Sequence, residues 1–195
     1  MPYLLPQPLG TSWPPYAYFC NAFCVNECET ILEFGKSRIL KPATVGNNQE
    51  DRKQRRAKIT WLEWSEEFDW VFDRLSEIVS HAHGYYPFHL SAITEPLQLT
   101  QYLGEDRGHY GWHRDIGEGP MSLRKLSMVV QLNPSSEFAG GEFEIFSVPG
   151  EIKTVTEIGQ GTVIVFPSWE VHRVKPVTAG ERWSLISWVS GPLFC

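Results

Sequence analysis

The chain has 195 residues, of which 42% are hydrophobic and 21% charged, a composition typical of a globular protein large enough for one core. Its net charge of −6 and pI of about 5.5 argue against a nucleic-acid binder, because such proteins present a basic face to the phosphate backbone. The sequence has no apolar run of the roughly 18 residues that a membrane-spanning helix needs. We therefore expect neither a nucleic acid nor a membrane as a partner.

Residues 1–15 contain five prolines and lack the basic segment that precedes the apolar part of a secretory signal. We expect an irregular Pro-rich arm there and a cytoplasmic location for the protein. The arm could pack on a second copy of the chain or lie loose, so a monomer and a homodimer both remain open.

Three of the four cysteines, Cys20, Cys24 and Cys28, recur every four residues and would line one face of a helix. Metal sites usually draw cysteines from turns with tighter spacing, so we interpret these three as small buried apolar side chains. In a reducing compartment we expect no disulfides, including at Cys195.

Two helices are predicted in the first half of the chain. Residues 26–34 carry an apolar stripe and are followed by Gly35, which is typical of a helix stop. Residues 65–83 place apolar side chains at helical spacing, with Ser65 as the N-cap. Between them, residues 41–54 have the polar, glycine-containing composition of a loop.

From about residue 97 the pattern changes to short β-rich runs separated by Gly, Pro, Asn and Asp. Such spacing predicts an antiparallel sandwich or barrel. The fold class is then α+β and mainly β, with flanking N-terminal helices packed outside the β core. The expected strands are residues 16–19, 58–62, 97–103, 108–113, 125–132, 141–146, 161–166, 172–177 and 183–190.

A candidate metal site lies in this β-rich half. His113 and Asp115 are two residues apart, so on a strand they would point to the same face. His172 follows a glycine-rich strand and a proline turn, and an antiparallel fold can bring it beside them. Two histidines and one carboxylate suit non-haem Fe(II), because they leave coordination positions open for other ligands. A structural zinc site would instead close its shell, usually with cysteines.

A candidate anion site follows ten residues later. Arg182 opens the last predicted strand, and Ser184 shares its face. A guanidinium inside a barrel needs an anionic partner, and its planar fork binds a carboxylate in bidentate fashion. The pair could hold the far carboxylate of a dicarboxylic acid that chelates the metal at its other end.

These motifs resemble the prolyl-4-hydroxylase-like branch of the 2-oxoglutarate/Fe(II) dioxygenases over about residues 55–190, and residues 171–182 are also similar to bacterial PKHD-type hydroxylases. The resemblance implies a double-stranded β-helix, or jelly roll, over about residues 97–191 within a single domain of residues 1–195. It also implies Fe(II), 2-oxoglutarate and O₂, with ascorbate as a candidate reductant. The segments that carry it are residues 55–62, 97–102, 109–115, 124–132, 138–143 and 172–188.

By this likeness His113, Asp115 and His172 match the iron ligands. Arg182 matches the basic residue that binds the C5 carboxylate of 2-oxoglutarate. Related halogenases have a small residue in place of the aspartate, so Asp115 favours hydroxylation.

The same likeness assigns further residues around the cavity. Tyr102 matches a strand tyrosine that contacts the co-substrate. Gln131 stands where some relatives have a tyrosine that helps at the carboxylate, so Ser184 is the candidate for that role here. Tyr110 and Arg55 match positions near the peptide substrate of prolyl hydroxylases.

The resemblance favours a peptidyl-prolyl hydroxylase acting on a protein or peptide, and three alternatives stay open. One is a hydroxylase of a free amino acid or other small molecule. Another is a nucleic-acid demethylase, although the second arginine typical of that class would fall at Trp188. The third is a non-catalytic jelly-roll binding module. Whether residues 41–58 close over the site as a lid bears on the choice, because a peptide needs an open groove.

Overall fold

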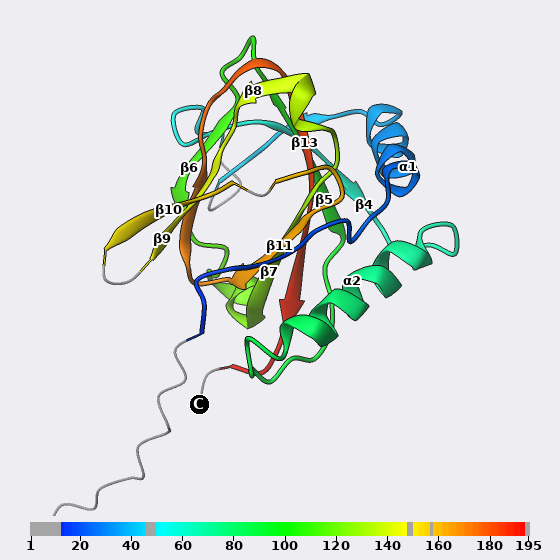
Figure 1. The fold of residues 1–195 in the computed structure, drawn as a ribbon, viewed down its shortest axis with the longest axis vertical. Helices are drawn as coiled ribbons and strands as arrows, with labels where there is room; N and C mark the ends of the chain where they lie inside the picture. Colours follow the sequence, from blue (N-terminus) through cyan, green and yellow to red (C-terminus); the bar gives the residue numbers. More distant parts are fainter. Residues whose placement is uncertain (1–12, 46–49, 148–149, 157, 194–195) are drawn as a thin grey trace, which may run out of the picture.

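The computed structural model describes residues 13–45, 50–147, 150–156 and 158–193, and it shows two antiparallel sheets with both helices on the side of the larger one (Figure 1). Nearly all of the Pro-rich arm lies outside the described residues. Within the described part of the chain, no helix is long and apolar enough to cross a membrane.

The larger sheet has eight strands, in the order β1-β11-β7-β13-β5-β4-β2, with β8 paired to β13. The smaller sheet has five strands, in the order β10-β9-β12-β6-β3. This is the mainly β, jelly-roll architecture that the sequence predicts. The strands are β1 (Ala17–Phe19), β2 (Lys41–Pro42), β3 (Arg55–Arg56), β4 (Lys58–Leu62), β5 (Leu97–Leu103), β6 (His109–His113), β7 (Arg124–Gln131), β8 (Phe138–Gly140), β9 (Phe143–Ser147), β10 (Glu151–Val155), β11 (Val163–Pro167), β12 (Val171–Val174) and β13 (Val177–Ser190).

The first predicted helix is present as α1 (Val25–Lys36), but Gly35 does not end it. A Cβ atom at this position would lie 3.2 Å from the Trp183 ring on β13. Gly35 therefore permits close packing of α1 on the sheet, and Ser37 is the C-cap. At the other end, the Glu27 carboxylate accepts a hydrogen bond of 2.7 Å from the backbone N–H of Cys24.

The second predicted helix begins later than expected, as α2 (Asp69–Ala82). Ser65 is not its N-cap, because residues 65–68 form a turn in which the Phe68 N–H donates to the Ser65 carbonyl. His83 is the C-cap, so the predicted C-terminus is confirmed. Two short 3₁₀ turns complete the elements, η1 (Gly119–Leu123) and η2 (Ser135–Glu137).

The interpretation of the cysteines is correct for one of the three that are described. Cys28 is fully buried in α1, whereas Cys20 and Cys24 are exposed. They differ because Cys20 lies in a turn before the helix and Cys24 is its N-cap. All three are free thiols, and Cys195 lies outside the described residues.

The strand predictions agree with the structure to different degrees. The bounds of β4 and β5 are those expected, whereas the predicted strand 172–177 is two elements, β12 and the start of β13. Pro176 lies between them and cannot donate a ladder hydrogen bond. The strand β10 was not predicted, since four of its five residues are exposed and carry no apolar alternation.

The central strands of the larger sheet are buried on both faces. Alternate residues of β7 enter two cores: Met128 and Val130 pack toward α1 and α2, whereas Val129 packs between the sheets. This explains why β7 is buried at all eight positions. The helices thus cover one face of the larger sheet and leave its other face to the barrel interior, where the candidate site lies.

Candidate metal centre

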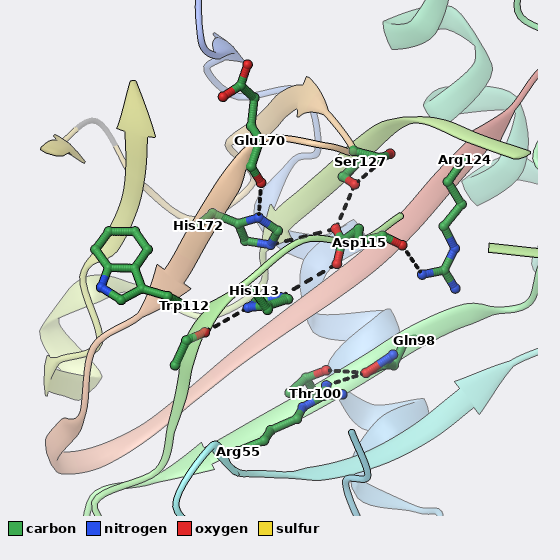
Figure 2. A network of polar contacts seen from close by, with 12 residues as sticks. Arg55, Gln98, Thr100, Trp112, His113, Asp115, Arg124, Ser127, Glu170 and His172 are labelled. Atoms are coloured by element: carbon green, nitrogen blue, oxygen red, sulfur yellow. Dashed lines mark hydrogen bonds and ion pairs between the residues drawn. The ribbon is translucent and has the colours of Figure 1, made fainter. Parts of the chain in front are cut away.

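The two predicted histidine ligands lie on adjacent strands of the smaller sheet. His113 on β6 and His172 on β12 are ladder partners, and their ring centres are 4.1 Å apart. The Asp115 carboxylate lies 3.6 Å from the Nε2 of His113 and 3.7 Å from the Nε2 of His172 (Figure 2). One ligand atom from each of the three residues lies within 4.8 Å of the others, which suits a single metal ion.

The reason given for placing Asp115 beside His113 is wrong, although the pairing is correct. The strand β6 ends at His113, so a shared strand face does not apply. Asp115 is held by the β11–β12 turn and by β7. Its N–H donates to the Ser168 carbonyl at 2.9 Å, its carbonyl accepts from Arg124 at 3.0 Å, and its carboxylate accepts from the Ser127 hydroxyl at 2.6 Å.

Both imidazoles are oriented by backbone carbonyls. The Nδ1 of His113 lies 2.8 Å from the Gly111 carbonyl, and the Nδ1 of His172 lies 2.9 Å from the Glu170 carbonyl. A carbonyl can only accept, so each Nδ1 carries the hydrogen and each Nε2 offers its lone pair toward Asp115. This is the tautomer that a metal ligand needs.

The charge state of the cluster also suits a divalent cation. Burial and the neighbouring His113 lower the pKa of His172 to about 4. Burial alone would raise the pKa of the Asp115 carboxyl, but the imidazoles of His172 and His113 and the Ser127 hydroxyl hold it well below its usual range. At neutral pH the cluster is therefore one carboxylate and at least one neutral imidazole donor.

A cavity of about 600 Å³ adjoins this cluster between the two sheets. Its lining includes the three candidate metal ligands, called the metal cluster below, and every other site residue that the sequence analysis selected. These are Arg55, Tyr102, Tyr110, His113, Asp115, His172, Arg182 and Ser184.

Among these residues, Arg182 indicates most directly what the cavity binds. Its side chain is 1% exposed, and its Nε donates to the Gln131 amide oxygen at 3.0 Å. Its two terminal nitrogens are buried and have no hydrogen-bond partner among the described residues. An unpaired buried guanidinium is costly, so a carboxylate in the cavity would satisfy it. 2-Oxoglutarate, which the sequence resemblance implies, carries such a carboxylate.

Ser184 and Tyr102 lie beside this guanidinium. Tyr102 on β5 is the ladder partner of Arg182, and the guanidinium carbon is 5.8 Å from the Tyr102 ring centre. Burial raises the pKa of the Tyr102 hydroxyl, which therefore stays a neutral donor. Ser184 is also buried, and it lies two residues after Arg182 on the same face of β13.

Gln131 has a role that the sequence analysis did not find. Its amide nitrogen donates to the Asn133 backbone carbonyl at 2.8 Å and lies 3.2 Å from the Asn133 side-chain oxygen. The amide oxygen is thereby fixed toward Arg182, and Gln131 does not line the cavity. It holds Arg182 in place and does not itself replace the tyrosine found in some relatives.

Tyr110 and Arg55 form a stack beside the metal cluster. The rings of Tyr110 and His113 are parallel within 12°, with centres 3.4 Å apart. The guanidinium carbon of Arg55 lies 4.5 Å from the Tyr110 ring centre. Strands β3 and β6 bring these residues together, since Arg55 is the ladder partner of Tyr110.

Arg124 is a buried cavity residue that the sequence analysis missed. It pairs with Glu95 at 2.5 Å and lies over the Trp188 ring at 3.7 Å. Like Arg182, it is a cation at the start of an apolar strand, so the same signal could have found it. Ser127 offered no such signal, because serine is common inside strands of mixed polarity.

The comparisons with known proteins agree with this geometry. A family model described as "2OG-Fe(II) oxygenase superfamily" matches residues 97–190. This match covers just under half of the chain and marks the segment as similar to that superfamily. The description of the model names 2-oxoglutarate and Fe(II), and His113, Asp115 and His172 are placed so that they could hold such an ion.

Curated relatives of this segment include PKHD-type hydroxylases. One from Hyphomonas neptunium is 35% identical over 112 residues, covering 53% of this chain and 49% of the relative. Another from Idiomarina loihiensis is 38% identical over 81 residues, covering 42% of this chain and 36% of the relative. The chain thus spans about half or less of the length of these relatives.

Solved structures show the same fold. A prolyl-4-hydroxylase from Pseudomonas putida superposes with a TM-score of 0.72 at 20% identity, covering 91% of this chain and 93% of that one. A prolyl hydroxylase from Trichoplax adhaerens, in complex with a hypoxia inducible factor peptide fragment, superposes with a TM-score of 0.74 at 18% identity, covering 91% and 84%. At these identities the likeness concerns the fold.

Proposed function

We propose that this chain is an Fe(II)- and 2-oxoglutarate-dependent dioxygenase that hydroxylates a C–H bond. The observation that carries the proposal is the unpaired fork of Arg182, which lies in the same cavity as the metal cluster. Two separate binding elements, one for a divalent ion and one for a carboxylate, are what a chelating keto acid with a second carboxylate requires. The larger sheet is common to both cores, which supports one oxygenase domain for the whole chain.

Each site residue receives a role. His113, Asp115 and His172 hold Fe(II), which when bound supplies the O₂ activation that converts 2-oxoglutarate to succinate and CO₂ and a substrate C–H to C–OH. Arg182 grips the distal carboxylate and fixes the direction in which the co-substrate extends from the metal. Ser184 and Tyr102 are additional hydroxyl donors beside that carboxylate.

The apolar walls of the cavity protect this chemistry. Val129, Phe143 and Ile186 also line the cavity, and they offer water no hydrogen bonds. Ser127 holds one oxygen of Asp115, so the carboxylate is oriented before a metal arrives.

We propose a peptidyl-prolyl residue as the substrate, with Tyr110 and Arg55 as contacts on the substrate side. Support comes from the PKHD-type relatives and from the fold shared with prolyl hydroxylases, one of which was solved with a peptide. Tyr110 and Arg55 lie on the cavity wall next to His113, where a substrate must approach the metal.

The other reaction classes have weaker support. Trp188, stacked under Arg124, occupies the position of the second arginine expected of a nucleic-acid demethylase. A non-catalytic binding module would not need three metal-ligand side chains held in a fixed orientation. A small-molecule acid remains a second candidate, because Arg55 adds a positive charge to the cavity. Residues 46–49 of the suggested lid lie outside the described residues, whereas Thr44 and Val45, which precede them in the sequence, line the cavity.

The proposal is tested by succinate formation from 2-oxoglutarate with Fe(II), ascorbate and a panel of proline-containing peptides. We expect peptide-stimulated succinate and a mass gain of one oxygen atom on proline. His172→Ala is the control and should lose both. Slow succinate formation that no peptide stimulates would keep the oxygenase and overturn the peptide substrate. No iron-dependent succinate at all would overturn the dioxygenase.

A further inference from the structure

The cavity contains three buried arginines, and they differ in what neutralises them. Arg124 is paired with the Glu95 carboxylate at 2.5 Å. Arg182 has two unpaired nitrogens and is assigned to the co-substrate. Arg55 is 9% exposed and forms no ion pair with any described residue. The question is what balances its charge.

The described partners of Arg55 are all neutral. One terminal nitrogen donates to the Gln98 side-chain oxygen at 2.5 Å (Figure 2), and the other lies 3.4 Å from the Thr44 carbonyl. The guanidinium plane covers the Tyr110 ring. Its Nε is buried and has no hydrogen-bond partner in the described part of the chain. Neutral contacts reduce the cost of a buried cation, but they leave its charge uncompensated.

The co-substrate and metal do not supply the missing charge. The positive charges of Fe(II) and Arg182 are equal in number to the negative charges of Asp115 and the two carboxylates of 2-oxoglutarate. The two sets therefore cancel. Arg124 and Glu95 cancel each other. The remaining charged lining residues, Arg114 and Glu118, are exposed to solvent and of opposite sign. A loaded cavity therefore retains one buried positive charge, at Arg55.

We propose, on the basis of the proposed function, that the substrate places a carboxylate against Arg55. The location is appropriate, because the Tyr110 ring contacts both the Arg55 guanidinium and the His113 imidazole. The carboxylate would thus lie on the hydroxylated residue itself or on its neighbour. Its source is either the α-carboxylate of a free amino acid or C-terminal residue, or the side chain of an adjacent Asp or Glu.

The test compares ligand pairs that differ only in this charge. The pairs are L-proline and L-prolinamide, a peptide ending in free proline and its amide, and an internal Pro-Asp peptide and its Pro-Asn counterpart. Binding is measured to the Mn(II)- and 2-oxoglutarate-loaded protein, which does not turn over, through the fluorescence of Trp61 and Trp188 on the cavity wall. We expect the acid of at least one pair to bind roughly ten- to a hundredfold more tightly, the range for a charge-assisted hydrogen bond. The pair that discriminates identifies the source.

Substitutions then assign the preference to Arg55. Arg55→Gln should remove the preference for the acid, and Arg55→Lys should retain part of it. Arg56→Gln is the matched control, since Arg56 donates to the Asp106 carbonyl outside the cavity and should leave the preference unchanged.

Three outcomes would overturn the inference. Equal binding of acid and amide in all three pairs would do so without any variant, even if Arg55→Gln failed to fold. So would a loss of 2-oxoglutarate affinity in Arg55→Gln with the preference for the acid unchanged, because Arg55 would then belong to the co-substrate. Failure of the wild-type protein to bind 2-oxoglutarate at all would overturn both the proposed function and the inference.

Discussion

The two sheets of the barrel contribute different halves of the site. The larger sheet, covered by α1 and α2, carries Arg182 and the residues around it. The smaller sheet carries both histidine ligands and the Arg55–Tyr110 pair, and its outer side is open to solvent at Phe146 and Ile152. Arg182 therefore lies on the sheet that both helices cover (Figure 1), whereas the two histidines lie on the sheet whose outer side is exposed.

The two ends also differ in how their polar atoms are satisfied. At the metal end, both Nδ1 atoms and the Asp115 carboxylate already have partners within the chain. At the other end, the fork of Arg182 has none among the described residues. The chain thus prepares the metal ligands by itself and leaves the co-substrate end to be completed by a ligand. This contrast can be tested from both sides.

The largest effect is expected from Arg182→Met. It removes the carboxylate fork, so 2-oxoglutarate affinity should fall by about 2–5 kcal/mol. The free energy of unfolding without ligand should change by less than about 2 kcal/mol, because removing unpaired buried donors offsets the loss of the Gln131 bond. Calorimetric titration and urea unfolding measure the two quantities. Unchanged 2-oxoglutarate affinity would show that another residue holds the carboxylate.

A pair of truncations compares the stability of the two sheets directly. Leu99→Ala on β5 empties a fully buried site under the helices and should reduce the free energy of unfolding by about 2–5 kcal/mol. Ile152→Ala on β10, where the side chain is 52% exposed, should cost less than about 0.5 kcal/mol. Urea denaturation of both variants checks this. Equal losses would mean that the smaller sheet is as stabilising as the larger.

Ser127→Ala tests whether the metal end is prepared by the chain. Loss of the hydroxyl that holds Asp115 should weaken Fe(II) or Mn(II) binding roughly ten- to a hundredfold. Ser187→Ala is the matched control, because the Ser187 hydroxyl is buried and has no hydrogen-bond partner among the described residues. Metal titration of both proteins decides the matter. Weaker metal binding by the Ser187→Ala variant would indicate a general loss of stability.

The smallest effect concerns the orientation of Arg182. Gln131→Met removes one hydrogen bond to its Nε and should weaken 2-oxoglutarate binding by about 1 kcal/mol. A 2-oxo acid without the distal carboxylate should bind the variant and the wild type equally. Gln101→Met provides the control, since Gln101 pairs with Glu181 away from the cavity. If both acids bind Gln131→Met more weakly, the residue does not act through Arg182.

Much of this site could be predicted because its residues have to differ from their surroundings. His113 and His172 were detectable because two histidines and a carboxylate form a metal-ligand set. Arg182 was detectable because a cation inside an apolar strand is costly without an anionic partner. Gln131 and Ser127 were not, because a neutral polar residue on a strand is compatible with many environments. The structure assigns them roles only through their hydrogen bonds to Arg182 and Asp115.

Local signals failed where packing decided the outcome. Gly35 looks like a helix stop, but the approach of Trp183 requires a glycine inside α1. Ser65 looks like an N-cap, but its own carbonyl closes a turn that delays α2 to Asp69. In both cases the helix ends depend on neighbours that are distant in the sequence.

The sequence by itself determined the mainly β fold, the three metal-ligand candidates and the arginine that faces them, because burial and charge leave few alternatives for those residues. Only the tertiary structure decided how Asp115 reaches the metal, since its backbone and carboxylate are held by Ser168, Ser127 and Arg124. It also decided that Arg124 has a carboxylate partner, whereas Arg55 has none among the described residues. Ion pairing depends on distances between strands far apart in the chain, and no local pattern of residues encodes those distances.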